Sequence, residues 1–112
     1  MGRRSAVAFA FVALLSAPAL ASEGAAQWAE RLDTEKEQCQ MLLALCRQAT
    51  DDLHDAASTP PGRDVLATRN AAMANLRVED AVSAARVFMR KNGGKRLPCF
   101  DAPVCRFLDG RL

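Results

Sequence analysis

Apolar residues recur every three or four positions along the segment from Ala25 to Thr59, which contains neither glycine nor proline. The segment is rich in alanine, leucine, glutamate, glutamine and arginine, which lose little side-chain freedom in a helix. Alternating steps of four and three residues trace one row: Trp28, Leu32, Glu35, Cys39, Leu42, Cys46, Ala49, Leu53 and Ala56. Because such a row is the packed face of an amphipathic helix, the pattern predicts one continuous helix over residues 25–59.

A second uninterrupted segment runs from Asp64 to Asn92 and has the same periodicity. Its row is dominated by alanine, with Val82 and Met89 beside it: Ala67, Ala71, Ala74, Val78, Ala81, Ala85 and Phe88. Small side chains let two helices approach closely. Basic residues in the last turn suit the negative end of a helix dipole, and Gly93 can adopt the left-handed conformation that ends a helix. We therefore expect a second helix over residues 64–92.

The connection between these helices, residues 58–63, is short and contains Pro60-Pro61-Gly62. A short rigid connection places consecutive helices side by side in opposite directions. Gly93-Gly94 then lets the C-terminal tail reverse and run back along the first helix. We expect an all-α fold, an antiparallel two-helix hairpin with a C-terminal tail pinned by disulfides. An alternative is that the tail forms a short third helix. The tail residues expected to cover the open side of the hairpin are Phe100, Phe107 and Leu108.

The four cysteines support this topology. Cys39 and Cys46 are seven residues apart, about 10 Å along a helix, whereas a disulfide requires Cα atoms within about 7 Å. Each must therefore bond to the tail, where Cys99 and Cys105 have a similar spacing. Antiparallel register predicts the pairs Cys39–Cys99 and Cys46–Cys105, and favours them over the crossed pairing. Each bond closes a loop of about 60 residues. By the chain-entropy relation, such a bond contributes roughly 4 kcal/mol to the free energy of unfolding.

The cysteine spacing also distinguishes structural disulfides from metal-binding, redox or haem-attachment cysteines. Zinc fingers and ribbons usually contain close cysteine pairs, separated by two to four residues, and redox enzymes often contain a CxxC pair. This chain has neither, nor a haem-attachment motif. Structural disulfides are the better interpretation, and they indicate an oxidising compartment.

The N-terminus has the organisation of a secretory signal peptide. Arg3 and Arg4 precede an apolar run over residues 6–15, and a small-residue cleavage motif ends at Ala21. An uncleaved membrane anchor is less favoured, because about 16 apolar residues fall short of the ~20 that span a bilayer. We predict a signal peptide over residues 1–21, a periplasmic or secreted protein, and no integral membrane segment after cleavage.

Cleavage leaves residues 22–112 as a single small helical domain with a thin core. It also removes Arg3 and Arg4, and with them the whole formal charge of +2. A neutral mature chain gives no support for nucleic acid as a partner. A lone hairpin exposes much apolar surface, so a protein partner or a homodimer is expected.

Asp51, His54 and Asp55 form the one cluster of side chains that suggests metal chemistry. At helical spacing they can face one way, as a surface site for Zn²⁺ or Cu²⁺ or as a base flanked by carboxylates. One histidine cannot complete a catalytic zinc set, and a solvated helix face is the preferred interpretation. The dispersed methionines, Met41, Met73 and Met89, are better explained as filling gaps between helices than as copper ligands.

No arrangement typical of an enzyme is present. The sequence has no nucleophile motif and no glycine-rich phosphate loop, and its single histidine would have to serve any nucleophile. A two-helix unit also offers little concavity for a substrate. We therefore expect a non-enzymatic protein without a cofactor.

Charge is unevenly distributed between the two helices. The end of the second helix and the start of the tail are basic, through Arg86, Arg90, Lys91, Lys95 and Arg96. The first part of the first helix is acidic, through Glu23, Glu30, Asp33, Glu35 and Glu37. In an antiparallel hairpin the two groups lie at the same end. Mutual neutralisation is favoured over a surface for an acidic partner or lipid headgroup. Glu35 interrupts the apolar row. Three interpretations are open: a position at the edge of the packed face, an ion pair with Arg86 or Arg90, or a position in an interface.

Three functional hypotheses follow. The leading one is a small exported binding or interaction protein of inhibitor, immunity or adaptor type, acting through a helical face or its C-terminal tail. An exposed apolar patch around Trp28, Leu43 or Phe107 would favour it. The second is an envelope metal-handling or stress-related protein that uses His54, Asp51 and Asp55. The third is a thiol–disulfide or other enzyme, which would require an easily reduced cysteine pair.

Overall fold

The computed structural model describes residues 24–60, 62 and 64–112, and the predicted signal peptide over residues 1–21 lies outside this range. The described chain is all-helical, as expected. It contains the α-helices α2 (Glu35–Ala57) and α3 (Asp64–Lys91) and two short 3-10 helices in the tail, η1 (Pro98–Asp101) and η2 (Pro103–Leu108). Residues 24–30 are also helical. The tail thus forms two 3-10 turns instead of a third α-helix.

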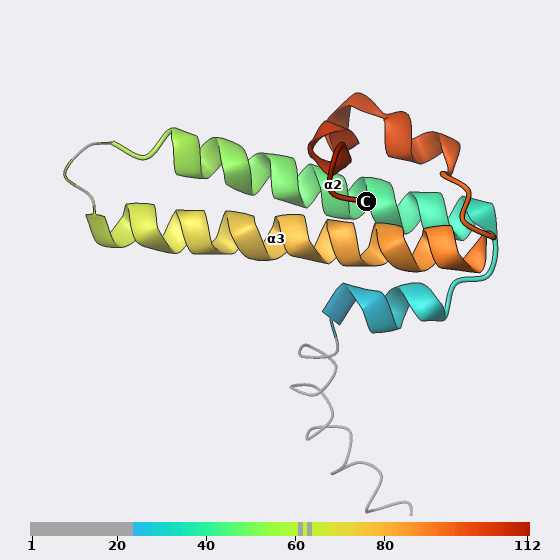
Figure 1. Cartoon of the computed structure of the whole chain (residues 1–112). Helices are drawn as coiled ribbons and strands as arrows, with labels where there is room; N and C mark the ends of the chain where they lie inside the picture. Colours follow the sequence, from blue (N-terminus) through green and yellow to red (C-terminus); the bar gives the residue numbers. More distant parts are fainter. Residues whose placement is uncertain (1–23, 61, 63) are drawn as a thin grey trace, which may run out of the picture.

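α2 and α3 lie side by side over most of their length (Figure 1). Gln38, near the start of α2, binds Asn92 just beyond the end of α3, with 2.8 Å between its Oε1 and the Asn92 Nδ2. Asp52, near the other end of α2, binds Arg77 in the middle of α3. The two helices therefore run in opposite directions.

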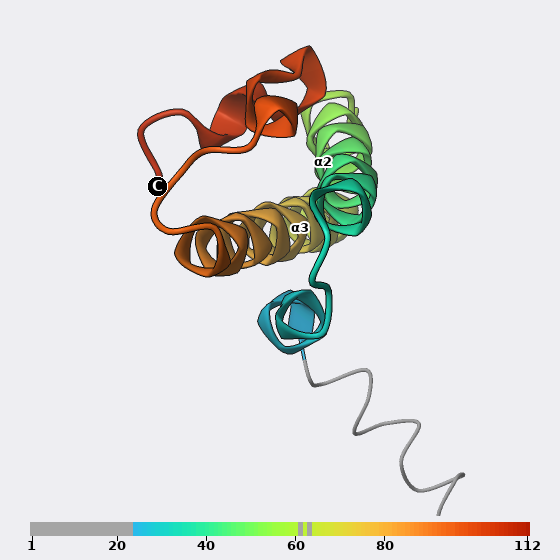
Figure 2. The same ribbon diagram turned by 90° about the vertical axis from the view of Figure 1, so that its right-hand side faces the viewer.

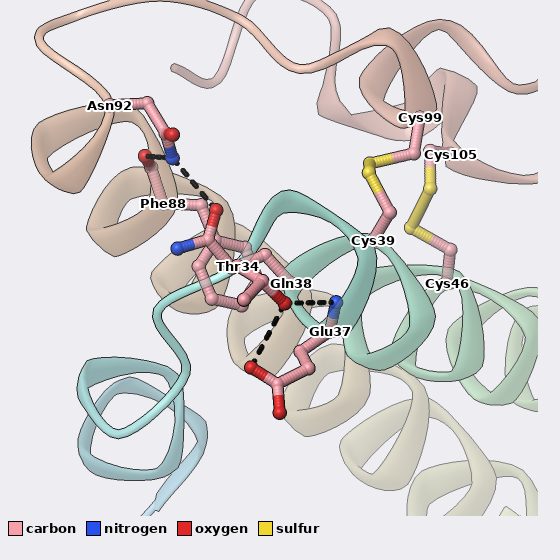
Figure 3. Close-up of a disulfide and its surroundings, with 9 residues drawn as sticks. All are labelled: Thr34, Glu37, Gln38, Cys39, Cys46, Phe88, Asn92, Cys99 and Cys105. Carbon is pink, nitrogen blue, oxygen red and sulfur yellow. Dashed lines mark hydrogen bonds between the residues drawn. A yellow bond between two sulfur atoms is a disulfide. The ribbon is translucent and has the colours of Figure 1, made fainter.

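The prediction of one continuous helix over residues 25–59 is wrong at the N-terminal end. Residues 31–34 interrupt it, and α2 begins only after Thr34. The Glu37 N–H donates to the Thr34 hydroxyl oxygen at 3.2 Å, and that hydroxyl donates to the Glu37 carboxylate at 3.0 Å (Figure 3). This is the Thr-x-x-Glu arrangement of a helix start. Glu35 consequently lies in the first turn of α2, where an acidic side chain suits the positive end of the helix dipole.

The helical segment 24–30 turns aside and lies beside the C-terminal part of α3 (Figures 1 and 2). Arg90 forms an ion pair with Glu30, and the Lys91 ammonium binds the Glu30 and Leu32 carbonyl oxygens and the Asp33 carboxylate. The face that this segment buries contains Ala25 and Ala29, while Trp28, a member of the expected row, is exposed.

α3 ends as the sequence predicts. Gly93 and Gly94 have φ values of +71° and +87°, the left-handed conformation that glycine adopts without strain. The Gly94 N–H donates to the Met89 carbonyl at 2.7 Å, which closes the last turn. The chain then reverses, and the tail returns along α2 (Figure 2).

Two disulfides attach this tail to α2: Cys39–Cys99 and Cys46–Cys105, with Cα–Cα distances of 5.7 and 5.2 Å (Figure 3). They are the pairs expected from the antiparallel register. The tail buries Leu97, Phe100 and Leu108 in the core formed with α2 and α3. Phe107, also expected to cover the hairpin, is only partly buried.

Gln38 is the one buried polar side chain among the described residues, with 1% of its surface exposed. Its Nε2 donates to the Leu32 carbonyl at 3.0 Å. Its Oε1 accepts from the Asn92 side chain, as Figure 3 shows. Asn92 also donates to the Phe88 carbonyl at 2.6 Å. Gln38 therefore joins the turn before α2 to the end of α3, with both polar ends of its amide bonded.

Candidate functional site

The hydrophobic core occupies only one end of the helix pair. We call the pinned end, formed by residues 24–49 and 78–112, the base. We call the other end, formed by residues 50–60 and 64–77 with Gly62, the arm. The tail reaches only as far as the start of the arm, where the Thr50 hydroxyl donates to the Val104 carbonyl at 3.1 Å. Within the described part of the arm, Ala74 alone is buried. The arm is therefore a two-helix projection with almost no core of its own.

Polar contacts hold the two helices of the arm together. Arg77 binds the Asp52 carboxylate at 3.3 Å. Nearer the connection, the Asn70 side chain donates to the Thr59 hydroxyl oxygen at 2.9 Å, and that hydroxyl donates to the Asp55 carbonyl at 2.9 Å. These contacts position α3 against α2, although no large apolar side chain of this part of α3 is buried.

The arm carries most of the exposed large apolar side chains of the described chain. Four lie on α3, with exposed fractions of 86% for Val65, 40% for Leu66, 37% for Met73 and 59% for Leu76. Leu66, Arg69, Met73 and Leu76 follow one another at steps of three, four and three, so they share one face of the helix. We call Val65, Leu66, Met73 and Leu76 the exposed row. It lies on a different side of α3 from the buried row of Ala74, Val78 and Ala81.

Steps of four and three continue the exposed row along α3 through Asp80 and Ser83 to Val87. In that continuation Val87 is partly buried against the core cluster that contains Ala25 and Ala29. Figure 1 shows segment 24–30 beside the C-terminal part of α3, well short of its N-terminal part. Among the described residues, segment 24–30 thus covers one part of this face and leaves the exposed row open.

Charged groups border the exposed row. Arg69 lies within its spacing and Arg77 follows it, whereas Asp64, three residues before Ala67, continues the row of Ala74 on the other side of α3. A shallow cleft of about 140 Å³ between the arm helices is lined by Asp52, Asp55, Arg69, Asn70, Met73 and Arg77. Beyond Arg77, desolvation by partial burial raises the pKa of Asp80, and the Arg77 guanidinium opposes that shift only in part. The face thus carries Arg69 between its apolar side chains, and Arg77 follows its C-terminal end.

The apolar patch expected around Trp28, Leu43 or Phe107 is present only in part. Trp28 is exposed, but Leu43 and Phe107 are partly buried against the core. Met41 and Met89 pack against the core as gap-filling residues should, whereas Met73 belongs to the exposed row. The spacing of this row is visible in the sequence, but periodicity alone predicts the alanine row as the packed face of α3 and does not show that a second apolar row stays exposed.

Asp51, His54 and Asp55 are exposed on α2 in the arm. Among the described residues, no group of three or more histidine, cysteine, aspartate or glutamate side chains is placed to hold a metal ion. The neighbouring Asp52 is engaged by Arg77. All four cysteines are in disulfides, so none of them is a free thiol.

Most of the basic run at the end of α3 binds groups within the chain. Arg90 and Lys91 bind residues 30–33, and the Arg86 guanidinium donates to the Arg111 carbonyl at 2.8 Å. Arg96 binds Asp101 at 3.1 Å. Neutralisation by Glu30 and Asp33 is therefore observed, whereas Glu23 lies outside the described residues.

Comparison with known proteins produced no match: no family model fits the chain, and neither a curated protein nor a solved structure is significantly similar to it. None of the helices in residues 24–112 that the structure describes is long and apolar enough to cross a membrane.

Proposed function

We propose that this chain is a small exported interaction protein, without enzymatic activity, that binds another protein through the α3 face of its arm. The observation that supports the proposal is the exposed row. Four large apolar side chains occupy one helix face, and Val65 and Leu76 keep more than half of their surface exposed. Contiguous apolar surface of this kind is typical of protein contact sites.

The contrast between base and arm supports a binding role. Two disulfides, the Gln38 contacts and the packed tail hold the base. The arm consists of the far ends of two long helices, which hold the exposed row clear of this fixed base. Helix faces with anchors at such spacing recur in recognition by helical partners. An inhibitor, an immunity protein or an adaptor would each fit this arrangement.

Export is part of the proposal. Two disulfides indicate an oxidising compartment, because cytosolic thiols are kept reduced. The basic residues, apolar run and small-residue motif of residues 1–21 fit a signal peptide cleaved after Ala21. Together they favour the periplasm or the extracellular space.

Site-specific photo-crosslinking in the organism of origin tests the proposal. A photoreactive amino acid at Leu76 should produce adducts heavier than the chain in the exported fraction. The same group at Arg47, exposed on α2 in the base, should not. Adding Leu66→Ser should reduce the adduct from position 76, because both residues belong to one binding face. Equal adducts at positions 76 and 47, or none at 76, would show that the arm is not a binding surface.

A further inference from the structure

We infer that the Cys39–Cys99 disulfide is a reversible redox switch: its reduction releases residues 95–102 from α2 while Cys46–Cys105 keeps the rest of the tail in place. We call residues 95–102 the η1 segment. The inference concerns the base of the molecule and is independent of the exposed row and its partner. It follows from two differences, in the accessibility of the two bonds and in the way the two parts of the tail are attached.

The two disulfides differ in their accessibility to a reductant. Cys46 and Cys105 are fully buried, whereas Cys39 and Cys99 keep part of their surface exposed. Exchange begins when a thiolate attacks a disulfide sulfur, so the exposed bond reacts first. The step requires a protein dithiol, which gives two electrons and two protons, becomes a disulfide itself and leaves Cys39 and Cys99 as thiols. In an oxidising compartment the bond is closed until such a dithiol reaches it.

Apart from its disulfide, the η1 segment is attached to α2 and α3 by apolar packing alone. Leu97 and Phe100 are buried, with 4% and 0% of their surface exposed. The polar contacts of the segment stay within the tail: Arg96 binds Asp101 at 3.1 Å and Asp109 at 3.9 Å. In the part of the chain that the structure describes, no hydrogen bond or ion pair joins residues 95–102 to α2 or α3.

The rest of the tail is bound to both helices by polar contacts as well. The Thr50 hydroxyl donates to the Val104 carbonyl at 3.1 Å, and the Arg86 guanidinium donates to the Arg111 carbonyl at 2.8 Å. Arg111 also forms an ion pair with Glu79. These contacts and the buried disulfide remain when the exposed bond opens. The loss of attachment is therefore confined to the η1 segment.

The connections of the η1 segment let it leave and return. The Gly93-Gly94 pair, with positive φ at both residues, joins it to the end of α3, and η1 is a single short 3-10 helix without a side-chain cap. Freeing such a segment restores backbone entropy, which offsets the exposure of Leu97 and Phe100. The buried disulfide still tethers the far end, so Cys99 stays within a short loop of Cys39. With only two free thiols, reoxidation restores the same pair.

Hydrogen exchange of the exported protein, before and after brief treatment with dithiothreitol, tests the switch. Alkylation verifies that Cys39 and Cys99 are the free thiols and that Cys46–Cys105 is intact. Backbone amides of residues 95–102 should then exchange about tenfold faster or more, while those of residues 35–49 and 78–91 change by less than about twofold. In a sample that is not alkylated, oxidised glutathione should restore the original pair and the slow exchange.

Paired substitutions separate the switch from the loss of a disulfide as such. Cys39→Ala with Cys99→Ala should give fast exchange of residues 95–102 without any reductant. Cys46→Ala with Cys105→Ala is the matched control, in which the η1 segment should keep its slow exchange because its own bond is closed. If the control variant does not fold, the measurement on the wild-type chain decides alone.

Three results would overturn the inference. Residues 95–102 that stay protected after Cys39–Cys99 has opened would show that apolar packing holds the segment without the bond. Loss of protection along α2 and α3 as well would show that reduction destabilises the whole base. Opening of both bonds together would show that no selective step exists. None of these results involves the exposed row, so the crosslink from position 76 tests the proposed function separately.

Discussion

Thr34 determines where α2 begins. Its side chain accepts the Glu37 N–H, one of the amide groups that a helix start leaves without an intrahelical partner. The residues before it are thereby freed from α2 and fold against α3. Four residues further on, Gln38 bonds both Leu32 and Asn92, so one short stretch sets both the helix start and the position of the preceding turn.

Replacing Thr34 with alanine should destabilise the protein. Loss of an N-cap side chain costs about 1 kcal/mol of the free energy of unfolding, which lowers Tm by roughly 4–8 °C for a domain of this size. Thermal unfolding followed by circular dichroism measures the change. The control is Thr68→Ala, at an exposed position of α3, where alanine should leave Tm unchanged or slightly higher. An equal drop in both variants would show that Thr34 does not act as a cap.

At the scale of elements, the tail depends on its two disulfides because it has little regular structure. η1 and η2 are short 3-10 helices, each preceded by an extended residue without a side-chain cap. Their apolar side chains complete the core of the base, since Phe100 and Leu108 are fully buried. The disulfides keep those side chains packed beside α2. Without the disulfides, a tail of this length would expose them to solvent.

The two disulfides should differ in their accessibility to reductant. Cys46 and Cys105 are fully buried, whereas Cys39 and Cys99 are partly exposed. Because thiol–disulfide exchange needs access to a sulfur atom, mild reduction of the folded protein should open Cys39–Cys99 first.

Timed alkylation and peptide fragmentation can measure this order. Trypsin leaves Cys39 and Cys46 on one peptide and Cys99 and Cys105 on another, so fragmentation must assign each labelled residue. The same peptides, left unreduced, test the pairing itself. Simultaneous labelling of all four cysteines would show instead that the bonds open only with global unfolding.

At the scale of the whole molecule, stability and exposure are divided between the two ends. Both disulfides, the packed tail and segment 24–30 all belong to the base, while the arm relies on polar contacts between two helices. A helix pair without a third element cannot bury both faces. The proposed binding surface is therefore at the end with the lowest local stability, where ordering by a partner has the largest effect.

Hydrogen exchange should reveal this division. In dilute solution, backbone amides of residues 50–57 and 64–77 should exchange faster than those of residues 35–49 and 78–91. The physical reason is that the arm opens locally without disrupting buried apolar contacts. Mass spectrometry of peptic peptides measures the difference. Uniform protection along α2 and α3 would contradict it, and would mean that the helix pair opens only as a unit.

Much of the fold could be predicted from residue patterns. The periodicity of α3, its alanine row and the glycines that end it are all present in the structure. The start of α2 was missed, although Thr34 and Glu37 have the spacing of a capping box, because the apolar row continues through them without a glycine or proline. Burial of Gln38 was missed because a polar residue becomes buried only when specific partners satisfy both ends of its amide.

The sequence by itself determined the helical class, the end of α3 and the cysteine pairs, because these depend on local spacing and on the reach of a disulfide. Only the tertiary structure decided where segment 24–30 lies and how far the tail extends along α2. Periodicity shows which residues share a helix face, but not whether another segment is long enough to cover that face. The exposed row is an example. Its spacing is that of a packed face, but within the described chain segment 24–30 covers only the C-terminal part of that face of α3.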